Sequence, residues 1–188
     1  MKPVKKLAID AGHGLGNVRP GKVDPGASFG GHTEAAIVLA YAKTLKHYAA
    51  LEGIVVHMIN TGEDENPVGG RDEQAELAGC DKYLSIHCNA GPTASKGTET
   101  LYRDSRDTVF AAIIQKATVQ SLKLKDRGLK PETVSPHGRL AVFDFDNGET
   151  ALVELGFLTN AGDLAAILDE DNRRAWAQAV IGGLSRIK

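Results

Sequence analysis

Two histidines stand where short apolar runs of the sequence end, and their type and place indicate metal chemistry. His13 follows the run at residues 7–11 and lies between two glycines, and His87 ends the run at residues 83–86. Both runs are typical of buried strands, and open α/β sheets collect ligands at the carboxyl edge of their strands. Two imidazoles at that edge are half of a metal site, because zinc in a hydrolase needs three ligands from His, Asp and Glu.

Glu34 is the best candidate for the third ligand. It lies in the first turn of a predicted helix that follows Thr33, a typical N-cap residue. Its carboxylate therefore hangs from a rigid element, which can hold a ligand accurately. A glutamate at this place also commonly complements the helix dipole, so its position alone does not identify a ligand.

A further carboxylate, Glu154, interrupts the otherwise apolar run at residues 150–157. Burying it there costs several kcal/mol unless it is paired or lies beside a metal site. A carboxylate kept at that cost is a functional candidate. The alternative is a strand-end glutamate that reaches solvent or pairs with Arg139.

The elements that must position these residues follow from the strand and helix signals. Strands are expected at residues 4–10, 53–60, 82–88, 98–103, 140–143 and 151–155, and helices at 34–51, at 71–78 and after Ser105, Asn160 and Asp171. This alternation predicts an α/β fold in one domain, residues 1–188. We expect a mixed, mostly parallel, twisted sheet of about six strands, covered by helices on both faces. The irregular segments 14–32 and 125–139 are expected to border the site.

Helical spacing also predicts which faces the later helices bury. The helix after Ser105 carries Val109, Ile113 and Ala117 on one stripe, and the last helix carries Ala175, Trp176, Ala179 and Val180. Gly182 and Gly183 are expected to weaken the end of that last helix.

Composition excludes several classes of protein. A net charge of −2 in 188 residues gives no basic field for nucleic acid. Cys80 and Cys88 lack metal-site or framework spacing and are expected to be free, buried thiols. No run approaches the roughly 18 apolar residues of a membrane span, and the first apolar run is too short for a signal peptide. We expect a protein made in the cytoplasm without stable membrane insertion.

Taken together, the motifs resemble the zinc-dependent N-acetylmuramoyl-L-alanine amidases of the family called amidase type 3. The resemblance covers nearly the whole chain, and its motifs are Ile9-Asp10-Ala11-Gly12-His13-Gly14, Asp24-Pro25-Gly26-Ala27, Glu34, Ser85-Ile86-His87-Cys88-Asn89-Ala90, Gly97-Thr98-Glu99 and Val153-Glu154-Leu155-Gly156-Phe157-Leu158-Thr159-Asn160. It implies that His13, Glu34 and His87 bind one Zn²⁺ ion and that Glu154 is the catalytic carboxylate. The implied reaction is hydrolysis of the amide between N-acetylmuramic acid and L-alanine in peptidoglycan.

The resemblance also suggests roles for two further residues. Asn89 is expected to orient substrate or a neighbouring group. Arg71 lies on the family's Arg-containing helix and is expected to have a structural or hydrogen-bonding role, with substrate contact as a further candidate role. The chain departs from the pattern in two places, because residues 15–23 lengthen the loop after His13 and His32 brings an extra imidazole that can replace or supplement a ligand.

Three other functions compete with the zinc amidase. A cysteine amidase would use Cys88 as nucleophile with His87 or His137 as base, but adjacent strand residues point to opposite faces. A nucleotide-binding module is suggested by the glycines at 12, 14 and 16, but Asn17 stands where the third glycine of the fingerprint belongs. A non-catalytic peptidoglycan-binding relative would lack a ligand or the carboxylate, and none is missing.

The expected partner is therefore peptidoglycan, attacked by a monomer in the periplasm or outside the cell. A phage lysin released through a membrane hole is the favoured origin, over an excised domain of an exported hydrolase or a spore enzyme.

Overall fold

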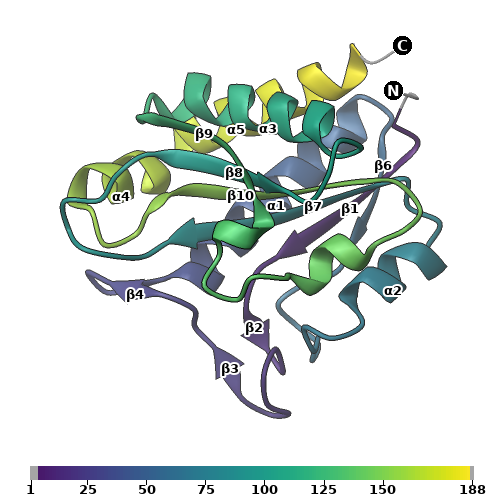
Figure 1. Cartoon of the computed structure of the whole chain (residues 1–188), viewed down its shortest axis with the longest axis horizontal. Coiled ribbons are helices and arrows are strands. Elements are labelled where there is room, and N and C mark those ends of the chain that lie inside the picture. The colour runs from purple at the N-terminus through teal and green to yellow at the C-terminus, as the bar shows by residue number, and fades with distance from the viewer. Residues whose placement is uncertain (1–3, 187–188) are drawn as a thin grey trace.

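A computed structural model describes residues 4–186, and its centre is a six-stranded sheet in the order β6-β1-β7-β10-β8-β9 (Figure 1). The strands are β1 (Lys6–Ala11), β6 (Val55–Met58), β7 (Lys82–Asn89), β8 (Thr98–Tyr102), β9 (Asp126–Pro131) and β10 (Glu149–Phe157). Pairing is parallel from β6 to β10, whereas β8 is antiparallel to β10 and parallel to β9. The predicted mixed, mostly parallel sheet is confirmed.

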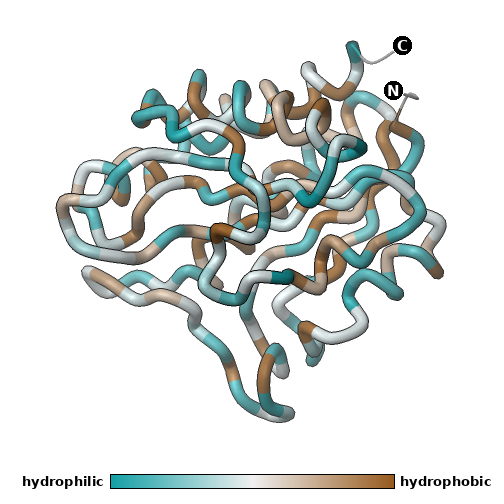
Figure 2. The backbone as a smooth tube through the Cα atoms, viewed as in Figure 1, coloured by the Kyte–Doolittle hydropathy of each residue, from teal (hydrophilic) through white to brown (hydrophobic). Residues whose placement is uncertain are grey.

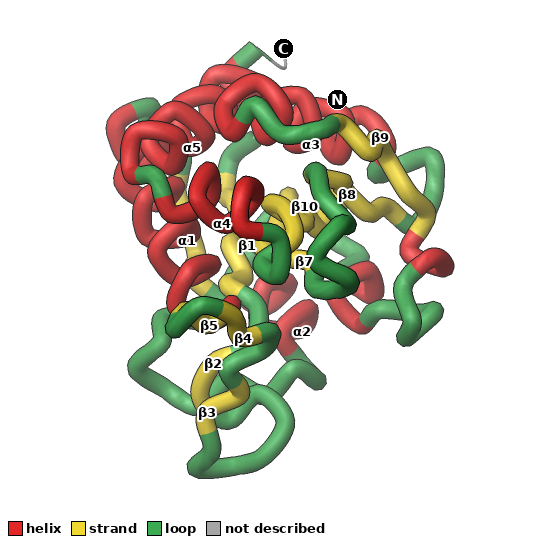
Figure 3. The backbone as a smooth tube through the Cα atoms, turned by 90° about the vertical axis from the view of Figure 1, so that its left-hand side faces the viewer, coloured by secondary structure: helices red, strands yellow, loops and turns green. Residues whose placement is uncertain are grey.

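Helices cover the two faces of the sheet unequally. They are α1 (Glu34–Leu51), α2 (Arg71–Leu77), α3 (Thr108–Leu122), α4 (Ala161–Leu168) and α5 (Glu170–Ser185). Helices α1, α3 and α5 lie together against one face, and α2 lies on the other (Figures 1 and 3). The second face also carries η2 (Ala141–Asp144), a 3-10 helix that contacts α2. As predicted, Thr33 caps α1 by accepting a hydrogen bond from the backbone of Ala36.

Successive side chains of each strand point to opposite faces of the sheet, so each face has its own hydrophobic core. In β7, for example, Leu84 and Ile86 belong to the large core under α1, α3 and α5, whereas Tyr83 belongs to the small core beside α2 and η2. Hydrophobic stretches follow the central strands, while the outer helices alternate between hydrophilic and hydrophobic turns (Figure 2). His87 and Glu154 have the parity of the small core, so the site lies on the face with less helical cover.

Two expectations for the second half of the chain are wrong. The apolar run predicted as a strand at 140–143 is η2, which buries Val142 and Phe143 in the small core. The segment 125–139 was expected to be irregular but begins with β9 and continues into η1 (Glu132–Val134), a short 3-10 helix. Strand β9 is an edge strand with polar residues, Gly128 and a terminal Pro131, and that composition hides it from pattern analysis.

The predicted stripes of the last two long helices need correction by about one residue. In α3 Ala117 is buried as predicted and Ile113 is partly buried, but Val109 is 56% exposed, and Phe110, Ala111 and Ile114 are buried on the same helix. In α5 Trp176 and Val180 are buried as predicted, but Ala175 is exposed. A Cβ at Gly183 would lie 2.5 Å from Ile113 Cγ2, so this glycine lets α5 approach α3 closely.

The irregular segment expected at 14–32 contains two short hairpins at the edge of the domain. One pairs β2 (Gly14–Leu15) with β3 (Val23–Asp24), and the other pairs β4 (Ser28–Phe29) with β5 (His32–Thr33). The β2–β3 hairpin projects from the body of the molecule (Figures 1 and 3). None of the helices within residues 4–186 has the length and apolar character that crossing a bilayer demands.

Candidate active site

Three side chains predicted as metal ligands face one point. Nε2 of His13 lies 3.1 Å from Oε2 of Glu34, and Nδ1 of His87 lies 3.0 Å from Oε1 of Glu34. The two imidazole centroids are 5.1 Å apart. Ligand atoms of the three residues all lie within 4.8 Å of one another, and no other such group occurs within residues 4–186. Two imidazoles and a carboxylate are a donor set that zinc accepts.

The local backbone explains how these side chains come together. His13 follows β1 in the left-handed region (φ 64°), Glu34 is the first residue of α1, and His87 lies near the end of β7. Close approach requires glycine at two positions. A Cβ at Gly12 would lie 2.3 Å from the His87 ring, and a Cβ at Gly26 would lie 2.6 Å from Oε2 of Glu34.

Asp24 fixes the orientation of the His13 ring. Its Oδ2 accepts hydrogen bonds from Nδ1 of His13 at 2.9 Å and from Nδ2 of Asn17 at 2.6 Å, and its Oδ1 accepts one from the Gly26 backbone. A carboxylate on the far ring nitrogen sets the tautomer of a metal-binding histidine and makes it a stronger ligand. Asp24 belongs to the Asp-Pro-Gly-Ala motif, but this role was not predicted from the sequence.

Charge and burial oppose each other in this cluster. Burial disfavours protonated His13, but hydrogen bonds and charges from Glu34 and Asp24 outweigh it and raise the His13 pKa to about 9. Glu34 likewise outweighs burial and raises the pKa of His87. Burial disfavours the Glu34 carboxylate, yet the two imidazoles hold its pKa well below the ordinary value. A metal ion that binds here must displace protons from the imidazoles.

Glu154 lies next to this cluster in the sheet. It is in register with His87 on β7 and with Glu99 on β8, so the three side chains share one face. Its Oε2 is buried and has no hydrogen-bond partner. Burial, with the charges of Glu34 and Glu99 also contributing, raises the Glu154 pKa to about 7 despite the opposing charge of His87. A carboxyl group with such a pKa is suited to both accept and donate a proton.

Glu99 is a buried member of the site to which the sequence analysis gave no role. Its Oε1 accepts a hydrogen bond from Nδ2 of Asn89 at 2.9 Å, and its Oε2 accepts one from Nε of Arg127 at 2.7 Å. The Arg127 guanidinium also lies 5.0 Å from the ring centroid of Phe157. Glu99 is a lone charge in the run 98–102, whose residue types are typical of a strand. A lone charge of this kind identified Glu154 as a functional candidate, and it could have identified Glu99 in the same way.

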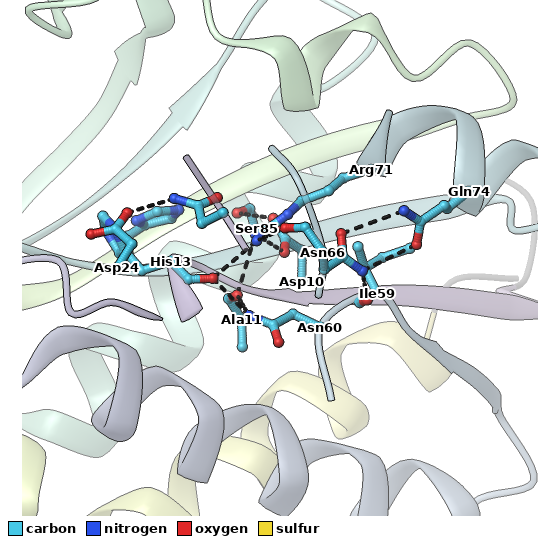
Figure 4. Close-up of polar contacts among 12 residues, drawn as sticks. Asp10, Ala11, His13, Asp24, Ile59, Asn60, Asn66, Arg71, Gln74 and Ser85 are labelled. Carbon is cyan, nitrogen blue, oxygen red and sulfur yellow. Dashed lines mark hydrogen bonds and ion pairs between the residues drawn. The ribbon is translucent and has the colours of Figure 1, made fainter. Parts of the chain in front are cut away.

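Arg71 holds the turn that carries His13 (Figure 4). Its Nη1 pairs with Oδ1 of Asp10 at 2.8 Å, and its Nη2 donates to the backbone carbonyls of His13 and Asn66. Asp10 also accepts a hydrogen bond from Ser85. Because the Arg71 side chain is 3% exposed and both Nη1 and Nη2 are engaged in these contacts, the geometry favours the expected structural role.

Replacing Arg71 by methionine is expected to destabilise the fold by about 3–5 kcal/mol, because the buried Asp10 carboxylate loses its counter-ion. Urea unfolding followed by circular dichroism measures the change. The matched control is Arg174→Met, which removes exposed ion pairs on α5 and should leave the unfolding midpoint unchanged. Equal midpoints for Arg71→Met and the wild type would contradict the role.

The alternation argument against a cysteine amidase agrees with the structure. Cys88 is 4% exposed and belongs to the large core, on the opposite side of β7 from the His87 imidazole. Burial, together with the charges of Glu34 and Glu154, raises the Cys88 pKa well above its ordinary value, which disfavours a thiolate nucleophile. Both cysteines are free and buried, as expected.

Cys88→Ser is therefore expected to keep kcat within about threefold of the wild type, since the thiol takes no part in the reaction. Release of stem peptide from purified cell walls measures this. A loss of more than about 100-fold with an intact fold would instead support the cysteine amidase.

The two remaining histidines of interest lie apart from the cluster. His32 is exposed in β5 and is not among the three residues that face the common point, so the structure does not support the alternative in which it replaces or supplements a ligand. His137 is exposed and lines the cavity described next.

A cavity of about 380 Å³ opens from the cluster across the less covered face of the sheet. His13, Glu34, His87 and Glu154 line it. Residues 134–137 and 140–142, between β9 and β10, line it as well, and so does Val68. The cavity is thus large enough for part of a polymeric substrate to reach the candidate ligands.

The fold and the site together define a class. Three His and Glu side chains that face one point at the carboxyl edge of an α/β sheet, with a fourth, unpaired carboxylate beside them, are the arrangement expected of a metal-dependent hydrolase. The model of the N-acetylmuramoyl-L-alanine amidase family matches residues 7–186. The chain belongs to this family, and the recognition from sequence motifs is confirmed.

Individual relatives agree with this assignment. The catalytic domain of CwlV, an N-acetylmuramoyl-L-alanine amidase from Bacillus (Paenibacillus) polymyxa var. colistinus, superposes with a TM-score of 0.84 at 28% identity, covering 98% of this chain and 99% of that domain. The N-acetylmuramoyl-L-alanine amidase LytC of Bacillus subtilis (strain 168) is 28% identical over 186 residues. The uncharacterized protein YqiI of the same organism is 29% identical over 184 residues. The chain spans 83% of YqiI but 34% of LytC, so it corresponds to one part of the latter.

Proposed function

We propose that the protein hydrolyses the amide between N-acetylmuramic acid and the L-alanine of the peptidoglycan stem peptide, with one zinc ion as cofactor. The observation that carries this proposal is the convergence of His13, Glu34 and His87 beside Glu154, whose buried Oε2 has no partner. Membership of the amidase family supports the substrate.

The ligands and the carboxylate have separate tasks in this proposal. His13, Glu34 and His87 hold the zinc ion, and Asp24 keeps the His13 ring in the orientation that binding requires. When bound, zinc lowers the pKa of water from about 15.7 toward 7 and polarises the scissile carbonyl. Glu154 takes a proton from the attacking water at Oε2 and later gives it to the nitrogen of the departing L-alanine. Thus one carboxyl group serves first as base and then as acid.

Other residues bind or support the substrate end of the site. Asn89 and Glu99 form a polar edge beside Glu154, and we propose that the Asn89 side chain orients the substrate near the scissile amide. Arg71 acts on the site by holding the carbonyl of His13, and its direct contact with substrate stays a prediction.

The proposal is tested on purified cell walls digested with the zinc-loaded protein. We expect new amino-terminal L-alanine and, by mass spectrometry, stem peptides separated from intact glycan strands. A zinc chelator should stop the release, and added zinc should restore it. Glycan cleavage without free L-alanine termini, or release that persists without metal, would overturn the proposal.

The biological setting proposed from the sequence is a lytic enzyme that works as a monomer. The phage-lysin origin stays a prediction. A fall in the turbidity of intact purified walls would support a lytic role, whereas cleavage restricted to soluble muramoyl peptides would contradict it.

A further inference from the structure

The cavity wall at residues 134–140 has little support of its own. It runs from Val134, the last residue of η1, to Leu140, the residue before η2, and contains no strand or α-helix. In the described part of the chain, hydrogen bonds of residues 134–138 stay within the segment and its neighbour Glu132, as when Ser135 donates to the Glu132 carbonyl and Gly138 to the Ser135 carbonyl. The position of this wall therefore depends on contacts made at its two ends.

Arg103, directly after β8, makes those contacts. Its Nε and Nη2 bind the Glu132 carboxylate at the start of the wall. Its Nη1 binds Oδ1 of Asp144 and the Phe143 carbonyl, and its Nη2 also donates to the Leu140 carbonyl at 3.0 Å. One planar guanidinium thus ties both ends of the segment to the sheet.

Glu132 strengthens the same link. Its carboxylate is buried, and Oε2 accepts a further hydrogen bond from the Leu140 backbone at 2.7 Å. Arg103 itself does not line the cavity. It therefore affects a bound molecule through the wall and not by touching it.

The chemistry of the cavity favours a peptide over a sugar beside this wall. Val134 on the wall and Val68 are 55% and 46% exposed, although both line the cavity. Exposed aliphatic side chains in a cavity mark a place for an apolar ligand group. Among the described residues that line it there is no Trp, Tyr or Phe on which a sugar ring would stack. Aliphatic walls fit the methyl and methylene groups of amino-acid side chains.

We propose that residues 134–140 form the stem-peptide wall of the cleft and that Arg103 is the positioning residue that holds this wall in place. The proposal rests on the proposed amidase function and deepens it by assigning this wall to the stem-peptide residues beyond the first L-alanine.

Arg103→Met tests the positioning role on two substrates, N-acetylmuramoyl-L-alanine and an N-acetylmuramoyl tripeptide. We expect KM for the tripeptide to rise about tenfold, while kcat and the zinc Kd stay within twofold. The KM for N-acetylmuramoyl-L-alanine should not change, because that substrate does not reach the wall. Hydrogen exchange of residues 134–140 should become at least about tenfold faster.

Arg174→Met is the control, because it also removes an arginine that forms ion pairs but lies outside the wall. Arg174 pairs with Glu170 and Asp171 on α5, does not line the cavity and is 50% exposed, so its loss should change neither KM nor hydrogen exchange of residues 134–140. Unchanged exchange in Arg103→Met would overturn the positioning role. Faster exchange with an unchanged tripeptide KM would overturn the peptide wall.

Val134→Ala tests the wall without disturbing Arg103. Because the Val134 side chain is exposed, shortening it should leave the protein folded. We expect the free stem tripeptide to bind the zinc-loaded protein about three- to fivefold more weakly by calorimetry. This binding does not depend on hydrolysis. A wild type that binds tripeptide but cleaves neither muramoyl substrate would therefore refute the amidase function alone, whereas equal binding by Val134→Ala would refute the wall.

Discussion

Replacing Glu154 by glutamine is expected to lower kcat by at least about 10³-fold while the protein keeps one zinc ion per chain. Glutamine has nearly the shape of glutamate, but its amide cannot take a proton from water or return one to the leaving nitrogen. Glu154 is not among the three residues that converge as ligands, so the metal should stay. Single-turnover release of L-alanine from a muramoyl peptide, with metal analysis of the same sample, measures both effects.

Glu73→Gln provides the control for this substitution. Glu73 is exposed on α2, away from the cavity, and the same chemical change there should leave turnover and zinc content unaltered. If Glu154→Gln were fully active, the proton would travel by another group and the assignment would fail. If it lost zinc, Glu154 would belong to the ligand set.

Replacing His13 by alanine is expected to weaken zinc binding more than 100-fold and to abolish turnover at ordinary zinc concentrations. Removal of a hydrogen-bond partner of a ligand typically costs 10–100-fold in affinity, and removal of the ligand itself costs more. Competition with a chromophoric chelator measures the zinc Kd.

Asp24→Asn gives the graded comparison. It keeps all three ligands but weakens the contact that orients the His13 ring, so we expect a zinc Kd 10–100-fold weaker than that of the wild type. The order wild type, Asp24→Asn, His13→Ala should hold for both zinc affinity and activity. Zinc binding by His13→Ala at wild-type affinity would show that the metal lies elsewhere.

The three candidate ligands and Glu154 could be selected from the sequence because each breaks a strong local pattern. His13 and His87 end apolar runs, Glu34 follows an N-cap, and Glu154 is a lone charge in a buried strand. Periodicity of two residues then places His87 and Glu154 on one face and Cys88 on the other. Neighbouring residues suffice to select each side chain as a candidate, whereas the roles come from the combination of all four and from the family resemblance.

The features that escaped prediction depend on contacts between distant segments. Val142 and Phe143 have the pattern of a strand, yet they belong to the 3-10 helix η2 and pack in the small core. Arg103 holds this helix by donating a hydrogen bond to the Phe143 carbonyl. Asp24 is eleven residues from His13, and nothing local shows that a hairpin brings it back to the ring. Short apolar runs and charged side chains take their roles from tertiary neighbours, which periodicity does not report.

Gly14 pairs with Asp24 at the base of the β2–β3 hairpin. Because of this pairing, the position of the Asp24 carboxylate and the length of the hairpin tip are set independently, which they would not be in a single unpaired loop. The base of the β2–β3 hairpin, together with the Asn17 side chain, returns the carboxylate to the imidazole whatever number of residues follows between 18 and 22. Insertions or deletions beyond that base can therefore accumulate, or be engineered, at little cost to metal affinity. The tip of the β2–β3 hairpin is therefore a suitable place to insert a new substrate-binding loop close to the cluster of His13, Glu34 and His87.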